Sequence, residues 1–320
     1  MAGPTAVVSG SGSIAKRLRA GDPIAYTITV TAAASILAIT ALLVYHLWSD
    51  SALPREKFGW SFITGSVWDP VAEQFGALPF MFGTVITSLL ALIIAVPVGL
   101  GAAIFLAELA PRSLSSALTF MIELLAAVPS VIYGLLGIFL LVPILQSYVV
   151  PPLVAVFGFL PLFQGTFHGV SVFSAGIVLA IMIVPFIVSV SREILLAVPN
   201  DQREAALALG ATLWESTWRV VVPYARRGIL GSVFLALARA LGETMAVTMV
   251  IGNRPSIQAS LLEPGYSIAA VIANEFSEAT TDFYQQSLIE LALVLFALTV
   301  IINGLARLMI LSMDGAARKT

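Results

Sequence analysis

Six long apolar stretches alternate with polar segments along this chain of 320 residues. They cover about 24–48, 80–108, 117–146, 171–196, 228–252 and 286–311. Each stretch is long enough, as a helix, to cross a hydrocarbon core about 30 Å thick. The third stretch contains AVPSVIYG at 127–134, where Pro129 should kink the helix. The pattern predicts an all-α integral membrane protein with six transmembrane helices.

The polar segments predict how the spans are joined. They indicate a cytoplasmic tail at 1–23, extracytoplasmic loops at 49–79, 147–170 and about 253–284, a cytoplasmic loop at 197–227 and a short tail at 313–320. A permease core would then occupy 80–312. The first apolar stretch could instead be a signal peptide, but the apolar core of a signal peptide is typically about 7 to 15 residues long. We therefore expect an uncleaved first span.

Composition and charge agree with this class and give it an orientation. The chain is 59% hydrophobic and only 11% charged, and a net charge of -2 says little about its partners. With the N-terminus inside, three of the sixteen basic residues fall outside, and one, Arg239, lies within a span. The remaining basic residues fall on the cytoplasmic side, as the positive-inside rule requires. Both termini are therefore expected in the cytoplasm.

Several kinds of chemistry are excluded or disfavoured by the residues present. Without cysteine, the chain has neither a disulfide framework nor a thiolate metal site. Its two histidines have no second ligand at metal-binding spacing, so no metal site is expected. The three lysines, Lys16, Lys57 and Lys319, lie outside any P-loop pattern. The chain is therefore not expected to bind ATP through such a loop.

The cytoplasmic loop at 197–227 predicts a short helix. Pro199 and Asp201 mark its start, and Glu204 follows in its first turns, where an anionic side chain suits the helix dipole. An ordinary amphipathic connector on the membrane surface is one interpretation. The loop also contains the pattern E-A-A-x-x-x-G, formed by Glu204, Ala205, Ala206 and Gly210.

The fifth apolar stretch contains two charged residues, Arg239 and Glu243. At 1.5 Å per helical residue, Arg239 would lie about 16 Å into the span. A charge near mid-membrane costs about 2.5 to 3.5 kcal/mol unless it is paired or faces water. The i, i+4 spacing would place both side chains on one helix face, as a structural ion pair. The other interpretation is an anion site on a translocation path, with Ser232 and Ala236 leaving room beside the charges.

Three motifs together resemble one family of transporters. The E-A-A-x-x-x-G pattern, closed by Val220, Val222 and Pro223, is similar to the EAA motif of ABC importer permeases. The run ARALGETMAV at 238–247 and the run AVPSVIYG at 127–134 narrow the resemblance to PstC-type permeases of phosphate ABC importers. The resemblance extends over about 80–312, and an extra first span is also expected in that family.

This resemblance implies a type I ABC importer permease fold and a division of roles. In that family the EAA segment forms a coupling helix that docks on the ATPase, which assigns coupling to Glu204, Ala205, Ala206 and Gly210. Arg239 and Glu243 match residues implicated in the substrate pathway. The implied partners are a homologous PstA-type permease, two PstB-type ATPases, a PstS-type phosphate-binding protein, membrane lipids and inorganic phosphate, but no nucleic acid.

Energy and location are also implied by the resemblance. ATP and Mg would bind to the partner ATPases, so this chain is expected to hold no cofactor and to catalyse no bond chemistry. It would lie in the bacterial cytoplasmic membrane. Permeases for sulfate or molybdate share the EAA motif, and an ion-coupled secondary transporter could also contain an intramembrane Arg and Glu, although it has no reason for a coupling helix.

Phosphate suits the two charged residues chemically. Arg239 offers a planar fork of donors to an oxyanion. Phosphate near neutral pH keeps at least one hydroxyl, which can donate to Glu243, whereas fully ionised sulfate has no proton to donate. Our hypothesis is that Arg239 attracts the anion and Glu243 disfavours sulfate, with further donors supplied by the partner permease. Glu243 as a simple counter-ion of Arg239 remains the alternative.

Overall fold

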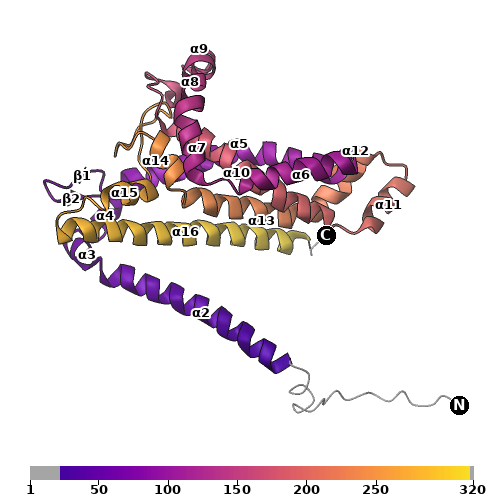
Figure 1. The fold of residues 1–320 in the computed structure, drawn as a ribbon, viewed down its shortest axis with the longest axis horizontal. Coiled ribbons are helices and arrows are strands. Elements are labelled where there is room, and N and C mark those ends of the chain that lie inside the picture. Colours follow the sequence, from indigo (N-terminus) through magenta and orange to yellow (C-terminus); the bar gives the residue numbers. More distant parts are fainter. Residues whose placement is uncertain (1–21, 318–320) are drawn as a thin grey trace. The chain divides into compact units, whose positions relative to one another are not determined.

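The computed structural model describes residues 22–317 and divides the chain into two units, Met1–Asp50 and Ser51–Thr320. Residues 1–21 of the predicted N-terminal tail and 318–320 of the predicted C-terminal tail lie outside the described residues. The described part of the first unit is one helix, α2 (Asp22–Ser49) (Figure 1). Its apolar side chains are exposed along its length. A helix that is apolar all round suits a lipid environment.

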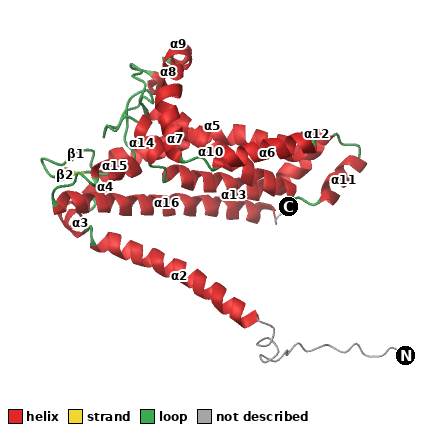
Figure 2. Cartoon of the chain, viewed as in Figure 1, coloured by secondary structure: helices red, strands yellow, loops and turns green. Residues whose placement is uncertain are grey.

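Six helical segments of the described residues are long and apolar enough to cross a membrane. They are Ala25–Ser49, Leu78–Leu109, Ser130–Phe157, Val172–Leu196, Leu213–Leu241 and Asp282–Ile310. The described residues are mostly helical (Figure 2), and one short strand pair lies between the first two of these segments. The predicted class and number of spans are therefore confirmed.

Two helices form the centre of the second unit. α5 (Leu78–Ile104) continues into a short π-helix, η1 (Phe105–Leu109), and packs against α10 (Val172–Leu196). A Cβ added at Gly176 would lie 2.5 Å from Leu90 Cδ2, so only glycine allows this close approach. α10 is buried along most of its length. Its C-terminal end, beside the end of η1, is where the loop that contains α11 (Asn200–Ala208) begins.

The third span differs from the predicted 117–146. The chain forms α6 (Arg112–Ala126) and breaks before Ser130. It then continues through α7 (Ser130–Leu136), η2 (Gly137–Leu141), α8 (Val142–Ile144), η3 (Leu145–Val149) and α9 (Val150–Phe157). Pro129 separates two helices instead of kinking one. The helix also extends into the loop predicted at 147–170, because prolines in the first turn of α9 leave no helical N–H unpaired.

The fifth span also differs, at both ends, from the predicted 228–252. Helix begins at α12 (Leu213–Ser216) and continues through η5 (Thr217–Val221) into α13 (Val222–Leu241). It starts early because Thr212 and Glu215 form a reciprocal capping box. It stops after Leu241, and a separate helix, α14 (Met245–Val250), follows. The loop predicted at 197–227 is correspondingly shorter.

The segments between spans gather at two ends of the second unit. α3, α4, the β1–β2 pair and α15 lie at one end of α16, whereas α11 and α12 lie at the other (Figure 1). The elements at the first end and α16 are α3 (Ala52–Phe58), α4 (Ser61–Thr64), β1 (Trp68–Asp69), β2 (Gln74–Phe75), α15 (Ile268–Glu275) and α16 (Asp282–Ala317). A 3-10 turn, η4, lies at Pro161–Phe163. β1 and β2 are antiparallel, with Trp68 opposite Phe75.

One carboxylate organises the end that contains α15. Glu275 accepts hydrogen bonds from Trp68 Nε1 at 2.9 Å, from the Tyr284 hydroxyl at 2.6 Å and from the Tyr266 hydroxyl at 3.2 Å. Burial raises the pKa of Tyr266, which keeps its hydroxyl available as a donor. These bonds join the strand pair, α15 and α16 into one polar-centred cluster.

Candidate functional site

The fifth span is interrupted beside the predicted charged residues. Arg239 lies in the last turn of α13, which ends at Leu241. Glu243 lies two residues beyond that end, before α14, and its Oε1 accepts the N–H of Ala246 at 3.1 Å. Broken helices at membrane depth are tolerated where the backbone is buried in protein or lines a water-filled cavity. The break therefore places the two charged residues at the end of the fifth span, Leu213–Leu241, where a polar site can lie.

Arg239 and Glu243 do not share a helix face, contrary to the prediction from their spacing. Among the side chains that the structure describes, no ion pair involves either residue. Each charge is instead beside a helix end of opposite partial charge: the C-terminus of α13 favours the guanidinium and the N-terminus of α14 favours the carboxylate. The prediction failed because it assumed an unbroken helix.

The two motifs that narrow the family resemblance, AVPSVIYG at 127–134 and ARALGETMAV at 238–247, meet at this break. A Cβ added at Gly134 in α7 would lie 2.6 Å from Met249 Sδ and 3.2 Å from Ala246 Cα, so glycine brings α7 close to α14. The Arg239 guanidinium carbon lies 5.9 Å from the ring centre of Phe186 in α10, within reach of a cation–π contact. Arg239 is nevertheless exposed and Glu243 is half-buried. Both remain accessible from outside this chain.

Ser232 and Ala236 occupy a different environment from the one expected. Their exposed fractions are 1% and 0%, and the Ser232 hydroxyl shares a 2.8 Å hydrogen bond with that of Ser191 in α10. Small residues of this kind allow close helix packing in membranes. In this structure they join α13 to α10 and do not line an open face, because α10 covers the side of α13 that carries them.

The loop after α10 contains the predicted short helix, α11 (Asn200–Ala208), which starts directly after Pro199. Of the motif residues, Glu204 and Ala205 are exposed, and Ala206 is buried. Gly210 ends the segment with a φ of 86°, in the left-handed region that favours glycine. Leu209, between α11 and Gly210, is 90% exposed. α11 therefore presents an open surface to a partner.

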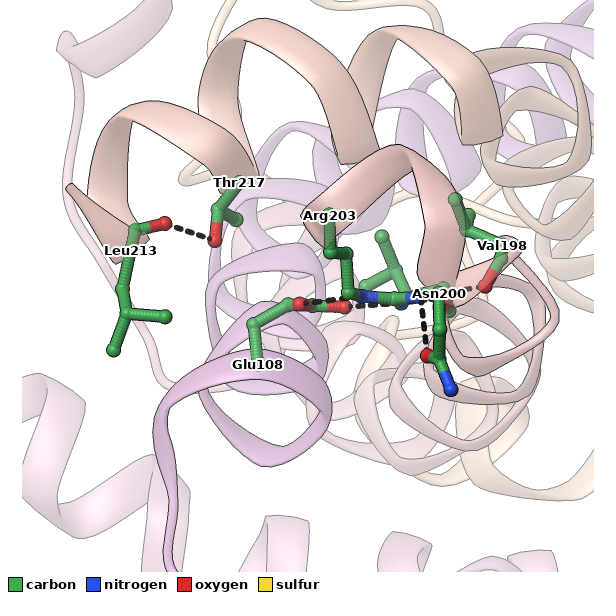
Figure 3. Close-up of polar contacts among 7 residues, drawn as sticks. Glu108, Val198, Asn200, Arg203, Leu213 and Thr217 are labelled. Atoms are coloured by element: carbon green, nitrogen blue, oxygen red, sulfur yellow. Dashed lines mark hydrogen bonds and ion pairs between the residues drawn. The ribbon is translucent and has the colours of Figure 1, made fainter. Parts of the chain in front are cut away.

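Sequence reasoning missed the most densely bonded side chain of the loop, Arg203. Its Nε and Nη2 donate to the two oxygens of Glu108 at 3.1 and 2.7 Å, and Nη2 also donates to Leu195 O at 2.7 Å. Nη1 donates to Val198 O at 2.5 Å and to Asn200 Oδ1 at 3.4 Å (Figure 3). We call this set of contacts the Arg203 clamp. It joins α11 to η1 and to the end of α10.

A cavity of about 290 Å³ adjoins the Arg203 clamp. Arg203 and Glu108 form one part of its wall, and Leu213, Ser216 and Thr217 form another. The side chains of the ion pair are only 18% and 8% exposed for Arg203 and Glu108. The cavity separates the clamped side of the loop from the side that leads into α12.

Comparison with known proteins identifies the family. A family model described as the binding-protein-dependent transport system inner membrane component matches residues 95–314. The chain belongs to this family. The permease is also 45% identical to the phosphate transport system permease protein PstC of Mesorhizobium japonicum, over 97% of this chain and 96% of that protein. It is 48% identical to the protein of the same name from Haemophilus influenzae, over 87% and 88%.

These relatives confirm the predicted resemblance to PstC-type permeases. A solved inward-facing structure of the MetNI methionine ABC transporter contains a chain with the same fold. The permease is 16% identical to that chain and covers 92% of it, with 73% of its own length and a TM-score of 0.51. The type I ABC importer permease fold is thereby confirmed. The permease is a multi-pass membrane protein, and its family implies a partner permease and ATPases.

Proposed function

We propose that this permease is a transmembrane subunit of an ATP-driven importer of inorganic phosphate. The observation that carries the proposal is Arg239, exposed beside a helix break and without an ion-pair partner among the described side chains. An arginine already paired within the chain would have fewer donors left for a ligand. The names of the PstC relatives support phosphate as the cargo.

Arg239 binds the anion through its planar fork of donors, which matches two oxygens of a tetrahedral oxyanion. Glu243 accepts a hydrogen bond from the hydroxyl of a protonated phosphate. It repels sulfate, which has no proton to donate. The contact with Ala246 uses one oxygen of Glu243, so the carboxylate still has acceptor sites for the ligand. One Arg offset by one Glu does not neutralise a dianion, so the partner permease supplies further donors.

The assembly follows from the family and from the open surface of α11. A PstA-type permease completes the pathway, and a PstS-type protein delivers phosphate from outside. Two PstB-type ATPases bind ATP and Mg, and they dock on α11 through Glu204, Ala205, Ala206 and Gly210. Exposed apolar side chains near this loop, such as Leu213 at 61% and Trp214 at 55%, support a protein contact there. This chain holds no cofactor.

The orientation rests on the distribution of charge. Arg203 lies in α11, and Arg219, Arg226 and Arg227 follow in η5 and the start of α13. The positive-inside rule places such a segment in the cytoplasm. The end that contains α3, the strand pair and α15 then faces outward, toward the binding protein (Figure 1). Both termini lie on the cytoplasmic side of the bacterial plasma membrane.

The test is uptake of labelled phosphate by the complex reconstituted into vesicles, with ATP inside the compartment that contains the ATPases. We expect ATP-dependent and binding-protein-dependent uptake that excess sulfate does not reduce. Equal competition by sulfate would indicate a general oxyanion permease. Uptake driven by an ion gradient, without ATP, would overturn the proposal altogether.

A further inference from the structure

We propose that Arg203 is a positioning residue that makes α11 and the cytoplasmic ends of α5 and α10 one rigid unit, so that a movement imposed on α11 reaches both spans together. The inference rests on the proposed function for its transport readout. Its structural part concerns this chain alone. Five contacts of one guanidinium carry it: two reach Glu108, 95 residues away in sequence, and three reach acceptors within eight residues of Arg203.

The donors of Arg203 are fully used. A guanidinium has five N–H groups, and the five contacts of the Arg203 clamp give each of them an acceptor. Two of those acceptors are Leu195 O, in the last turn of α10, and Val198 O, two residues beyond the end of that helix. Lysine has three donors on a point charge and does not reproduce this fork. The side chain at this position therefore determines whether the three elements stay joined.

The far side of the clamp is itself rigid. Glu108 lies in η1, which continues α5 without interruption. α5 and α10 pack tightly near their cytoplasmic halves, where a Cβ added at Gly99 would lie 2.8 Å from Ile187 Cγ2. Two helices in such contact move together more readily than they separate. A force on α11 is therefore delivered to a pair of spans and not to a single helix.

α11 also packs against η5 and α12, without an ion pair to either element among the described residues. Beyond Ala208 the chain turns at Gly210, where a Cβ would meet nothing within 4 Å, and it reaches α12 across the cavity that adjoins the clamp. Glycine backbones have more conformational freedom than any other residue. The Arg203 clamp thus holds α11 to η1 and to the end of α10, while α13 packs against α10, where a Cβ added at Gly228 would lie 2.5 Å from Ile194 Cγ2.

A transport experiment separates this role from a merely stabilising one. In the reconstituted complex, Arg203→Lys should assemble and hydrolyse ATP close to the wild-type rate, because the docking surface of α11 is retained. Phosphate taken up per ATP hydrolysed should fall about tenfold, within the usual range of coupling between sites. Arg192→Lys is the matched control: Arg192 pairs with the adjacent, 69% exposed Glu193 at 2.7 Å and does not join separate elements through that pair.

A distance measurement tests the rigid unit without reference to cargo. The chain has no cysteine, so spin labels can be placed at Gln202→Cys in α11 and Leu109→Cys in η1, both exposed positions. The complex is prepared with cysteine-free partners. Pulsed EPR should give one distance distribution in both the nucleotide-free and ATP-bound states. With Arg203→Lys, the distribution should broaden or differ between the two states.

The outcomes distinguish the two proposals. A wild-type complex that takes up no phosphate overturns the proposed function, while the distance measurement still tests the clamp. A wild-type distance that changes with ATP, or an Arg203→Lys variant that retains the wild-type distribution in both states, overturns the rigid unit. If Arg203→Lys does not assemble, Glu108→Gln, which keeps the shape of the acceptor, replaces it with the same expected results.

Discussion

Two Arg–Glu pairs of this permease are arranged in opposite ways. Arg239 and Glu243 are four residues apart in sequence, yet a helix end separates them and they form no ion pair. Arg203 and Glu108 are 95 residues apart, yet they form a bidentate contact of 2.7 and 3.1 Å. We call the pair that is close in sequence the open pair, because it forms no ion pair, and the pair that is distant in sequence the closed pair, because it forms one.

The difference follows from what satisfies each charge. In the distant pair the partners satisfy one another, and the remaining donors of Arg203 bind carbonyls at a helix end. In the local pair, each charge is beside a helix terminus of opposite sign. Arg239 is therefore stabilised without using its donors on a carboxylate. A closed pair suits transmission of force, and an open pair suits binding of an anion.

The largest expected effect is at the open pair. Arg239→Ala removes two charge-assisted hydrogen bonds to the anion, each worth about 1.5 kcal/mol, so phosphate uptake should fall about 100-fold. Arg239→Lys keeps the charge without the fork and should be intermediate. Uptake is measured in vesicles, with co-purification of the ATPase as the control for assembly. Full uptake by Arg239→Ala would remove Arg239 from the pathway.

A smaller effect is expected at its partner. Glu243→Gln removes the charge that repels sulfate, so the preference for phosphate over sulfate should fall about tenfold, equivalent to one hydrogen bond. Competition of sulfate with labelled phosphate measures it. Glu193→Gln, at an exposed carboxylate in the surface pair with Arg192, is the control and should leave selectivity unchanged. Unchanged selectivity in Glu243→Gln would leave the carboxylate with only its cap on α14.

The smallest effect compares a glycine from each region. Gly210, next to α11, has a φ of 86°, whereas Gly242, inside the helix break, has a φ of -93°. Gly210→Ala should therefore destabilise the complex by about 1 kcal/mol. Gly242→Ala should cost less than about 0.5 kcal/mol, since its nearest neighbour, Ala238 O, would be 3.7 Å away. Denaturant titration of the purified complex measures both values. A large cost at Gly242 would mean that glycine itself makes the break.

Sequence alone predicted the class, the six spans and the start of α11, because apolar length and Pro199 act locally. It did not predict where the third and fifth spans end. Helix continues past Pro151 because a proline in the first turn costs no hydrogen bond. The break after Leu241 was not predicted, because residues 228–252 form one apolar run in the sequence.

The contacts of the Arg203 clamp are harder still to predict from a sequence pattern. Glu108 is at the end of one apolar stretch and Arg203 is inside the motif loop, and nothing in their spacing brings them together. The only available signal is that both were expected on the cytoplasmic side. Tertiary packing of α5 against α10 determines that their ends meet.

The most direct test of the comparison is a pair of double-mutant cycles on the purified complex, with the free energy of unfolding as the readout. The first cycle combines Arg203→Gln with Glu108→Gln, and the second combines Arg239→Gln with Glu243→Gln. We predict a coupling energy of about 2 to 3 kcal/mol for the first pair and less than about 0.5 kcal/mol for the second. Equal coupling in the two cycles, or stronger coupling between Arg239 and Glu243, would contradict the account.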